Sequence, residues 1–409
     1  MYTPKEIEQI CQWSVEYAGT SANRLLLGSN AIPAAYRPAV ATQIKLQQLL
    51  RGKLPSLNEL GIYIPEGINL EQASGEVSAC YKQQFVHPKD ILLDMTGGLG
   101  IDFWAMAQMV DRAVYVEQSE TLYSASAYNL PRLLPNRPIS LLHGDSMQML
   151  EELLSQHHPS IIYIDPARRE DIMGSKRVYA IEDCTPNLYE LIERLKRLSQ
   201  PPRLLVKISP MLDIKHTLEH IPYVRQIEIV AVKSQAKELL LMIDLSLPQF
   251  PQDEITIKAT DLDVSGQATS FSGTYAEEQA SPLLLSPAPL AYIYEPNAAL
   301  MKSGLYHSLS KRLGTGQLHQ HTHLYTSNEL LPDFPGRKFH LLEVIPFRSA
   351  TIKTLKKRIP TSMISCRNFP LKVDALRQKL GIKDGGETML IGTTLQDGST
   401  ALLLCKIIS

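Results

Sequence analysis

ILLDMTGGLGID, residues 91–102, is the stretch that decides the fold. A short apolar run ends in Asp94, a loop with Gly97, Gly98 and Gly100 follows, and the apolar pattern of a helix comes next. Glycines let a loop adopt positive φ and approach a ligand closely. The N-terminus of the helix that follows offers free N–H groups at the same place. The stretch therefore predicts a strand, a ligand-binding loop and a helix.

The same alternation of strands and helices continues along the chain. Short apolar runs predict strands at 91–95, 113–117, 140–144, 161–165 and 203–209, with helices at 101–110, 120–130, 146–156 and 187–199. Such alternation is typical of βαβ units around a parallel sheet. The last two strands, predicted at 225–232 and 237–245, are separated by only four residues, which indicates an antiparallel hairpin. A parallel sheet with this ending is uncommon among nucleotide-binding folds.

Two more acidic residues follow predicted strands. Glu117 lies 19 residues after Gly98, where an acid can bind both hydroxyls of a ribose. Asp145 follows the third strand and can accept a hydrogen bond from an adenine amine. One acid alone would more simply cap the next helix. Three acids at the carboxyl ends of three successive parallel strands, however, face one crevice.

The loop also indicates which nucleoside ligand is bound. A dinucleotide fingerprint needs G-x-G-x-x-G, and here Phe103 stands where the third glycine would be. Asp94, just ahead of the loop, repels a pyrophosphate but suits a ligand with a cationic amino group. S-adenosylmethionine is such a ligand.

The chain resembles a known family at several motifs. Residues 90–245 resemble a class I S-adenosylmethionine-dependent methyltransferase through DMTGGLG (94–100), YVE (115–117), GDS (144–146) and IDPARR (164–169). The whole chain is similar to a bacterial family that joins such a domain to a ferredoxin-like insert and a C-terminal THUMP-like RNA-binding domain. The motifs that carry this likeness are DPARR, YEPN (294–297), SCRNFPL (365–371) and GIKDGGE (381–387).

The resemblance implies an α/β fold with a Rossmann-like methyltransferase sheet and S-adenosylmethionine as the cofactor. It implies cofactor binding by Asp94, Thr96, Gly97, Gly98, Gly100, Asp102, Glu117, Gln118, Asp145 and Ser146.

The same resemblance places the catalytic residues at Asp165, Pro166 and Arg168. They occupy the position where amino-methylating enzymes carry D/N-P-P-aromatic and hold the target amine through the acid and the adjacent carbonyl. Asp165 would hold the acceptor in line with the methyl group, and positioning supplies much of the rate. Arg168 replaces the stacking aromatic residue, and arginine can stack on a base or bind a phosphate.

Uracil-C5 methyltransferases carry a similar motif, but they need a cysteine after the fifth strand. Ser209 stands at that position in this chain. Cys184 is the only thiol near it in sequence, and we expect it to be a buried structural residue rather than a nucleophile.

Charge is distributed unevenly along the chain. Residues 336–409 contain 13 Lys and Arg against 5 Asp and Glu, a net charge of +8, whereas residues 1–249 and 250–335 carry −4 and −5. A basic module on an acidic body indicates a polyanion partner, although a solvated lysine-rich face has the same composition. We expect RNA phosphates to contact Arg169, Lys176 and Arg177 beside the pocket, and Lys353, Lys356, Lys357, Arg358 and Arg367 in the basic module.

The predicted organisation has four parts. These are a helical region (1–75), the methyltransferase domain (76–248), a ferredoxin-like α+β unit (249–335) and a basic THUMP-like domain of order βαβαββ (336–409). His319, His321 and His323 are expected to alternate along a strand, as an exposed polar face. The N-terminus has no apolar signal segment, no apolar run approaches the ~20 residues of a membrane helix, and the five cysteines are widely spaced. These features predict a cytoplasmic protein without a membrane segment, disulfide framework or metal site.

The sequence therefore predicts a methyltransferase that uses S-adenosylmethionine to modify structured RNA, a tRNA or an rRNA. Two alternatives stay open. One is a methyltransferase for a protein or a small molecule, and the other is an RNA-binding protein whose methyltransferase fold is inactive.

Overall fold

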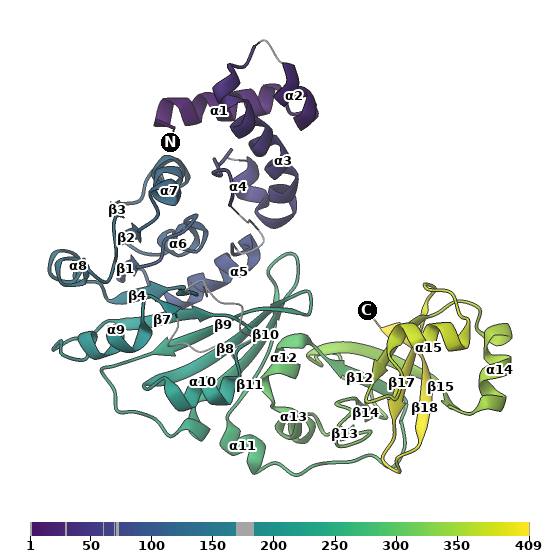
Figure 1. Ribbon diagram of the computed structural model, residues 1–409. Helices are drawn as coiled ribbons and strands as arrows, with labels where there is room; N and C mark the ends of the chain where they lie inside the picture. The colour runs from purple at the N-terminus through teal and green to yellow at the C-terminus, as the bar shows by residue number, and fades with distance from the viewer. Residues whose placement is uncertain are drawn as a thin grey trace, which may run out of the picture. The chain divides into compact units, whose positions relative to one another are not determined.

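The structure, a computed structural model, describes residues 2–28, 31–59, 61–68, 70, 73–168 and 184–408. The chain forms two compact units (Figure 1). Unit 1 contains Met1–Arg225, Lys237–Phe250 and Val264–Gln267, and unit 2 contains Gln226–Ala236, Pro251–Asp263 and Ala268–Ser409. None of the described helices combines the length and the hydropathy that crossing a membrane requires.

Unit 1 begins with helices, as predicted. They are α1 (Pro4–Glu16), α2 (Ala22–Gly28), η1 (Ala34–Tyr36), α3 (Arg37–Lys53), α4 (Pro55–Glu59), α5 (Glu76–Tyr81) and η2 (Lys82–Phe85). Thr3 caps α1, and its backbone N–H donates to Glu6 at 2.7 Å in a capping box. Ile7 and Ile10 of α1 and Val40 of α3 belong to one buried cluster, whose members avoid water by packing together.

The strands of unit 1 build the predicted sheet. They are β1 (Ile91–Asp94), β2 (Arg112–Glu117), β3 (Ile139–His143), β4 (Ile161–Ile164), β7 (Arg203–Ile208) and β9 (Gln235–Ile243). Their order is β3-β2-β1-β4-β7-β9. The first five strands pair in parallel, and β9 runs antiparallel to β7. The parallel sheet with an antiparallel ending is therefore confirmed.

Helices cover this sheet and connect its strands. They are α6 (Ile101–Ala107), α7 (Glu120–Leu133), α8 (Leu150–His157), α9 (Leu188–Leu195) and α10 (Ile214–His220). All four residues of β4 are buried, as expected for a strand covered on both faces. The chain leaves β1 toward β2 on one side, and β4 pairs with β1 on the other. Open α/β sheets bind ligands at such a switch point, outside the carboxyl ends of the strands.

The other strand of the predicted hairpin, β8 (Val224–Val232), lies in unit 2 from Gln226 onward. Lys233 and Ser234, both with positive φ, form the two-residue turn between β8 and β9. β10 (Thr256–Leu262) pairs parallel to β8, and β11 (Ala268–Gly273) pairs antiparallel to β10. The polar composition of residues 250–275 is compatible with a linker or with edge strands, and the structure forms two paired strands there, which α11 (Tyr275–Gln279) follows.

The rest of unit 2 is built on one seven-stranded sheet. Its strands are β12 (Tyr292–Pro296), β13 (Gly316–Gln317), β14 (Tyr325–Ser327), β15 (Gly336–Pro346), β16 (Met363–Arg367), β17 (Thr388–Thr394) and β18 (Thr400–Ile408), in the order β13-β14-β12-β15-β18-β17-β16. Its helices are α12 (Ala298–Ser303), α13 (Tyr306–Leu313), α14 (Ser349–Arg358) and α15 (Val373–Leu380). The order βαβαββ of the basic module is confirmed. Ile293 of β12 shares one buried cluster with Phe339 and Leu403, so the predicted ferredoxin-like and THUMP-like parts have a common core.

Two local predictions in unit 2 are wrong. The sequence pattern of residues 297–314 predicts one helix, but these residues form two, because Gly304 adopts a φ of 75° and ends α12. The strand expected to carry three histidines starts only at Tyr325. His319 and His321 lie instead in a turn, and His323 has a positive φ, so the three side chains do not alternate along a strand.

Candidate active site

The glycine loop (residues 95–100) joins β1 to α6. Gly98 and Gly100 have φ values of 57° and 73°, a conformation that favours glycine. A Cβ at Gly97 would fall within the ring of Tyr115. The Tyr115 hydroxyl also donates to the carbonyl oxygen of Gly98 at 2.6 Å. The shape of this loop therefore requires all three glycines that the sequence analysis selected.

Asp94 and Glu117 lie beside the glycine loop, at the carboxyl ends of β1 and β2. The two Glu117 oxygens accept the N–H groups of Gly98 and Ser119, each at 2.7 Å. Asp94 is buried and accepts the N–H of Thr96 at 2.9 Å, and its other oxygen has no hydrogen-bond partner among the described residues. Burial raises the pKa of Asp94 well above its usual value, and neighbouring carboxylates raise it further. Asp94 is thus a buried carboxyl group that forms no ion pair with a cation in the part of the chain that the structure describes.

Asp145 follows β3 and stands at the same edge of the sheet. Its carboxylate accepts the backbone N–H groups of Met147 at 2.9 Å and Gln148 at 3.2 Å, which closes a turn ahead of α8. Ser146 next to it is buried, and Gln118 is exposed. The structure places all three predicted acids at the carboxyl ends of neighbouring strands, and Asp145 also has the simpler capping role.

A cavity of about 360 Å³ opens at this edge, within the size range of small-molecule sites. It brings together Asp94, Thr96, Gly97, Gly98, Gly100, Asp102 and Asp165 of the predicted residues. Its lining does not include Glu117, Gln118, Asp145, Ser146 or Pro166. Ser74, Tyr163 and Lys207, which were not predicted, complete its polar wall.

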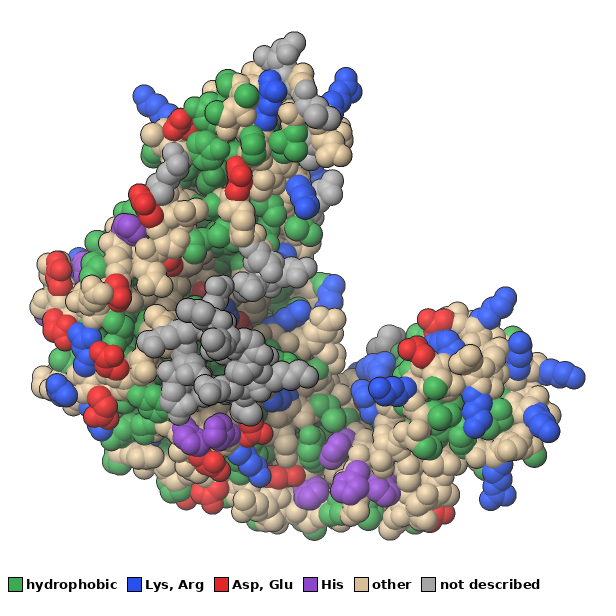
Figure 2. Space-filling model, in the orientation of Figure 1, with side chains coloured by type: hydrophobic (Ala, Val, Ile, Leu, Met, Phe, Trp, Pro, Cys, Tyr) green, Lys and Arg blue, Asp and Glu red, His purple; other side chains and the backbone are tan. Residues whose placement is uncertain are grey.

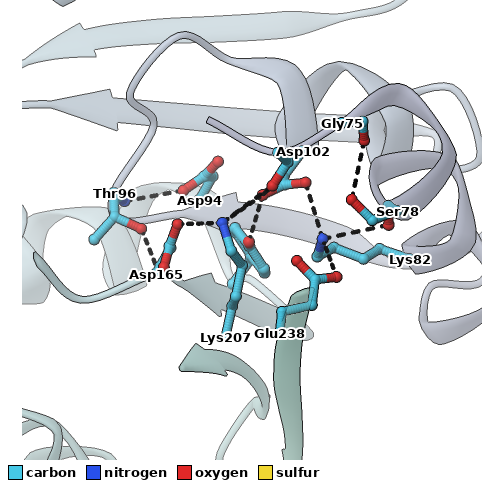
Figure 3. Close-up of polar contacts among 11 residues, drawn as sticks. Gly75, Ser78, Lys82, Asp94, Thr96, Asp102, Asp165, Lys207 and Glu238 are labelled. Carbon is cyan, nitrogen blue, oxygen red and sulfur yellow. Dashed lines mark hydrogen bonds and ion pairs between the residues drawn. The ribbon is translucent and has the colours of Figure 1, made fainter. Parts of the chain in front are cut away.

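Asp102, in the first turn of α6, belongs to a buried ion cluster (Figure 3). Lys82 places its Nζ 3.1 Å from Asp102 Oδ1 and 2.6 Å from Glu238 Oε1. The hydroxyls of Tyr163 and Ser74 donate to Asp102 Oδ2, each at 2.7 Å. Burial alone would raise the pKa of Asp102, but the nearby ammonium groups and these hydroxyls hold it well below its usual range. Both Asp102 oxygens are therefore engaged by protein groups.

Lys207, near the end of β7, extends this cluster into the cavity (Figure 3). Its Nζ lies 2.5 Å from Asp165 Oδ2, 3.0 Å from Ser74 Oγ and 3.4 Å from Asp102 Oδ2. The N–H of Asp165 donates to Thr96 Oγ1 at 2.7 Å, which ties Asp165 to the glycine loop. Burial alone would lower the pKa of Lys207, but the surrounding carboxylates raise it well above its usual range. Lys207 is therefore a protonated group on the cavity wall.

The sequence analysis missed Lys207, Lys82 and Glu238. Each is a charged residue within a predominantly apolar stretch, RLLVKIS (203–209), EVSACYKQQFV (76–86) and KELLLMIDL (237–245). A charged side chain in such a stretch is expected to be buried together with its apolar neighbours. It then needs an oppositely charged partner, because charged side chains are seldom fully buried unless they are paired. The pattern does not identify its partner, which comes from another element.

Several predicted residues are placed only in part. The backbone of Arg168 pairs with Cys184, as β5 (Ala167–Arg168) runs antiparallel to β6 (Cys184–Thr185). The Cys184 side chain is half-buried, whereas we expected it to be buried. The predicted phosphate contacts Arg169, Lys176 and Arg177 lie outside the described residues.

The basic residues of α14 are exposed, as predicted. Arg358 pairs with Glu343 at 2.6 Å. Lys353, Lys356 and Lys357 have no acidic partner among the described residues, so their charges are available to a polyanion.

Arg367 on β16 is placed differently from the α14 residues. It lies 2.5 Å from Glu295, a buried residue that Arg337 also pairs with. The structure therefore gives Arg367 an internal partner, which leaves its guanidinium less available to RNA.

Potential metal ligands gather away from the cavity. In the described part of the chain, one group places three ligand atoms within 4.8 Å of one another, on exposed residues of α10: His216, Glu219 and His220.

Three domain families match the chain. Residues 2–46 match an "N-terminal domain in putative methyltransferase", residues 292–335 a ferredoxin-like domain, and residues 336–406 a THUMP domain-like family. The ferredoxin-like and THUMP-like matches are the two domain types that the resemblance of the sequence implied. Among curated proteins, none matches it.

Solved structures give a full-length relative. The crystal structure of a "putative methyltransferase" from Porphyromonas gingivalis W83 is 40% identical, covers 100% of both chains and has a TM-score of 0.93. A "putative class i s-adenosylmethionine-dependent methyltransferase" from Listeria monocytogenes is 12% identical over 64% of this chain and 93% of its own, with a TM-score of 0.34. A "putative tRNA (m1A22) methyltransferase" from Streptococcus pneumoniae, in complex with S-adenosyl-L-methionine, is 14% identical over 44% and 76%, with a TM-score of 0.31. At these TM-scores the last two likenesses carry no argument.

The sheet order and the glycine loop define the class: a Rossmann-like α/β protein of the class I methyltransferase type. The chain belongs to the methyltransferase family that combines this sheet with the N-terminal, ferredoxin-like and THUMP-like domains, as its full-length relative and its domain matches establish.

Proposed function

We propose that this protein transfers a methyl group from S-adenosylmethionine to a nucleotide of structured RNA, a tRNA or an rRNA. One observation carries the proposal. A cavity at the switch point of the sheet is lined by a glycine loop, by Asp165 and by the carboxyl of Asp94, which has no cation partner among the described residues. The family membership adds the reaction class.

The cavity fits the proposed cofactor. S-adenosylmethionine would supply a methyl group on a positively charged sulfur, and it also carries an ammonium group. Asp94 would bind that ammonium, because Asp94 lines the cavity and a cation would offset the cost of ionising a buried carboxyl. Glu117 would bind the ribose hydroxyls, since a carboxylate oxygen that accepts one N–H still has a lone pair for a second donor.

Asp165 would hold the acceptor. Its side chain is 39% exposed and borders the cavity, while its N–H is fixed by Thr96 on the glycine loop. This arrangement would allow Asp165 to position an acceptor next to the cofactor. Correct positioning of the two reactants contributes much of the rate of a transfer reaction.

RNA as the substrate is supported by unit 2. The THUMP-like module of this chain, residues 336–409, carries a net charge of +8, and Lys353, Lys356 and Lys357 are exposed without acidic partners among the described residues. Figure 2 shows Lys and Arg side chains spread over this module, with few acidic ones between them. Such a surface suits binding to phosphates without sequence readout.

The experiment has two measurements. Titration calorimetry with S-adenosylmethionine tests the cofactor, with NAD as a competing ligand. Incubation with tritiated cofactor and either RNA or total protein from a strain that lacks the gene tests the substrate. Label in protein alone would support the protein alternative, and cofactor binding without any transfer would support a binding protein with an inactive fold.

Asp165→Ala and Cys184→Ala separate the catalytic roles. We expect Asp165→Ala to lose methyl transfer with its cofactor affinity nearly intact, and Cys184→Ala to keep most of its activity. A covalent enzyme–RNA adduct that disappears with Cys184 would establish uracil-C5 chemistry instead.

A further inference from the structure

Lys207 occupies the place where a target amine would be expected. In the D/N-P-P-aromatic arrangement, the acid accepts hydrogen bonds from the amine that is methylated. Here Asp165 Oδ2 already accepts from an ammonium group, the Nζ of Lys207, at 2.5 Å. An amino acceptor would have to share this carboxylate with a fixed cation.

Hydrogen-bonding capacity distinguishes the possible acceptors. An amino group on a base presents two N–H donors and has only its lone pair for attack on the methyl carbon. The ammonium group of Lys207 is also a donor, so it could form a hydrogen bond with the amine only through that lone pair. The lone pair would then not be free to attack the methyl carbon. A hydroxyl has one donor and two lone pairs. It can donate to Asp165, accept from Lys207, and keep one lone pair for the methyl carbon.

The charges of the ion cluster favour the same acceptor. Two ammonium groups, Lys82 and Lys207, face three carboxylates, Asp102, Glu238 and Asp165, which leaves one negative charge in excess. Asp165 is the most exposed of the three carboxylates and borders the cavity. A proton released by the acceptor would neutralise that excess at Asp165. An amine that becomes cationic on methylation would instead develop its charge next to Lys207.

We propose, on the basis of the proposed RNA methylation, that the methylated atom is a ribose hydroxyl oxygen, with Asp165 as proton acceptor and Lys207 as the donor that orients the oxygen. A lone pair of the hydroxyl oxygen forms the bond to the methyl carbon. The carbon–sulfur bond breaks, and its electron pair goes to sulfur, which becomes neutral. The hydroxyl proton passes to Asp165, which becomes a neutral carboxylic acid, so charge and atoms balance. Lys207 stays protonated throughout, consistent with the carboxylates that surround it.

The product chemistry tests this directly on the wild-type, full-length protein. RNA from a strain that lacks the gene is labelled with tritiated S-adenosylmethionine and hydrolysed in alkali. A methylated 2′-oxygen cannot attack the neighbouring phosphate, so the label should emerge in alkali-resistant dinucleotides. Label in mononucleotides would show base methylation and overturn this inference, while leaving the proposed RNA methylation intact. Cofactor binding with no label in RNA would overturn both.

Variants of Lys207 test its role separately. Lys207→Met should lower kcat by about 100-fold or more, the lower bound typical of lost proton-transfer or charge stabilisation, with cofactor affinity within about twofold. Lys207→Arg, which keeps a charged donor, should recover part of kcat. Lys89→Met removes an exposed lysine of the same unit and should match the wild type. Full activity of a folded, cofactor-binding Lys207→Met would overturn the assigned role.

Discussion

Removing Lys82 should destabilise unit 1 in a way that depends on pH. Lys82 has a fully buried side chain and is paired with Asp102 and Glu238. Lys82→Met keeps most of the side-chain volume and removes the charge. Asp102 retains Lys207 and two hydroxyl donors, whereas Glu238 loses its closest cation. Glu238 must then become protonated in the folded protein.

The cost of that protonation sets the magnitude. A Glu carboxyl has an ordinary pKa of 4.5, which lies 2.5 units below pH 7. Protonating such a group at pH 7 therefore costs at most about 3.4 kcal/mol, at ~1.36 kcal/mol per unit. This is an upper bound, because burial raises the pKa of Glu238 even beside Lys82. It agrees with the ~3–5 kcal/mol typical of breaking a buried ion pair from one side. At pH 5 the same cost falls to about 0.7 kcal/mol.

The sign follows from the linkage of protonation to folding. In the variant, the pKa of Glu238 is raised further in the folded state, so the folded protein binds more protons than the unfolded one. Its stability therefore decreases as the pH rises above 4.5. We expect the destabilisation by Lys82→Met to grow by up to about 1.4 kcal/mol per pH unit between pH 5 and pH 7.

Urea denaturation followed by tryptophan fluorescence measures this effect. The two tryptophans, Trp13 and Trp104, both lie in unit 1, so the signal reports on this unit alone. Lys82→Met combined with Glu238→Gln should recover most of the stability, because no carboxylate then needs a proton. A loss below about 1 kcal/mol at pH 7, or an equal loss at pH 5 and pH 7, would refute the assignment of Lys82 as the counter-ion of Glu238.

Three further predictions concern the ligands. Glu117→Ala should weaken S-adenosylmethionine binding by roughly 1.5–3 kcal/mol in calorimetry, the loss of charge-assisted hydrogen bonds, with the fold intact; unchanged affinity would exclude Glu117 as the ribose ligand. Because the pKa of Asp94 is raised and the ammonium group binds its ionised form, cofactor affinity should increase as the pH rises above 3.8 and level off once Asp94 has ionised. Asp94→Asn should abolish this pH dependence, and a persistent dependence would assign it to another group. Replacing Lys356 and Lys357 by Ala should weaken RNA binding about equally for different sequences, and each lost contact should flatten the salt slope by about one unit or less in filter binding. An unchanged slope would mean that these lysines form only a solvated face.

Local patterns in the sequence were sufficient for most of the fold. Short apolar runs between 91 and 209 predicted the five parallel strands, and the short connection at Lys233, a two-residue turn in the structure, allowed the hairpin to be recognised. Both properties depend on neighbours in the chain: short runs of consecutive apolar residues along strands that are buried on both faces, and a turn conformation that few residues permit. The prediction of one helix over 297–314 is wrong because the apolar pattern continues past Gly304. This single glycine ends α12 and so decides between a continuous helix and a break.

The candidate site was only partly accessible to such reasoning. The glycine loop and the acids after β1, β2 and β3 could be located, since the carboxyl ends of parallel strands must meet at one edge. The sequence by itself thus determined the sheet and the glycine loop, and it located Asp94 and Glu117 at the carboxyl ends of β1 and β2. Only the tertiary structure decided which groups face one another across the cavity. Lys207 meets Asp165 from a strand 42 positions away, because buried charges are stable only when folding brings an opposite charge within contact distance, and no local pattern records that distance.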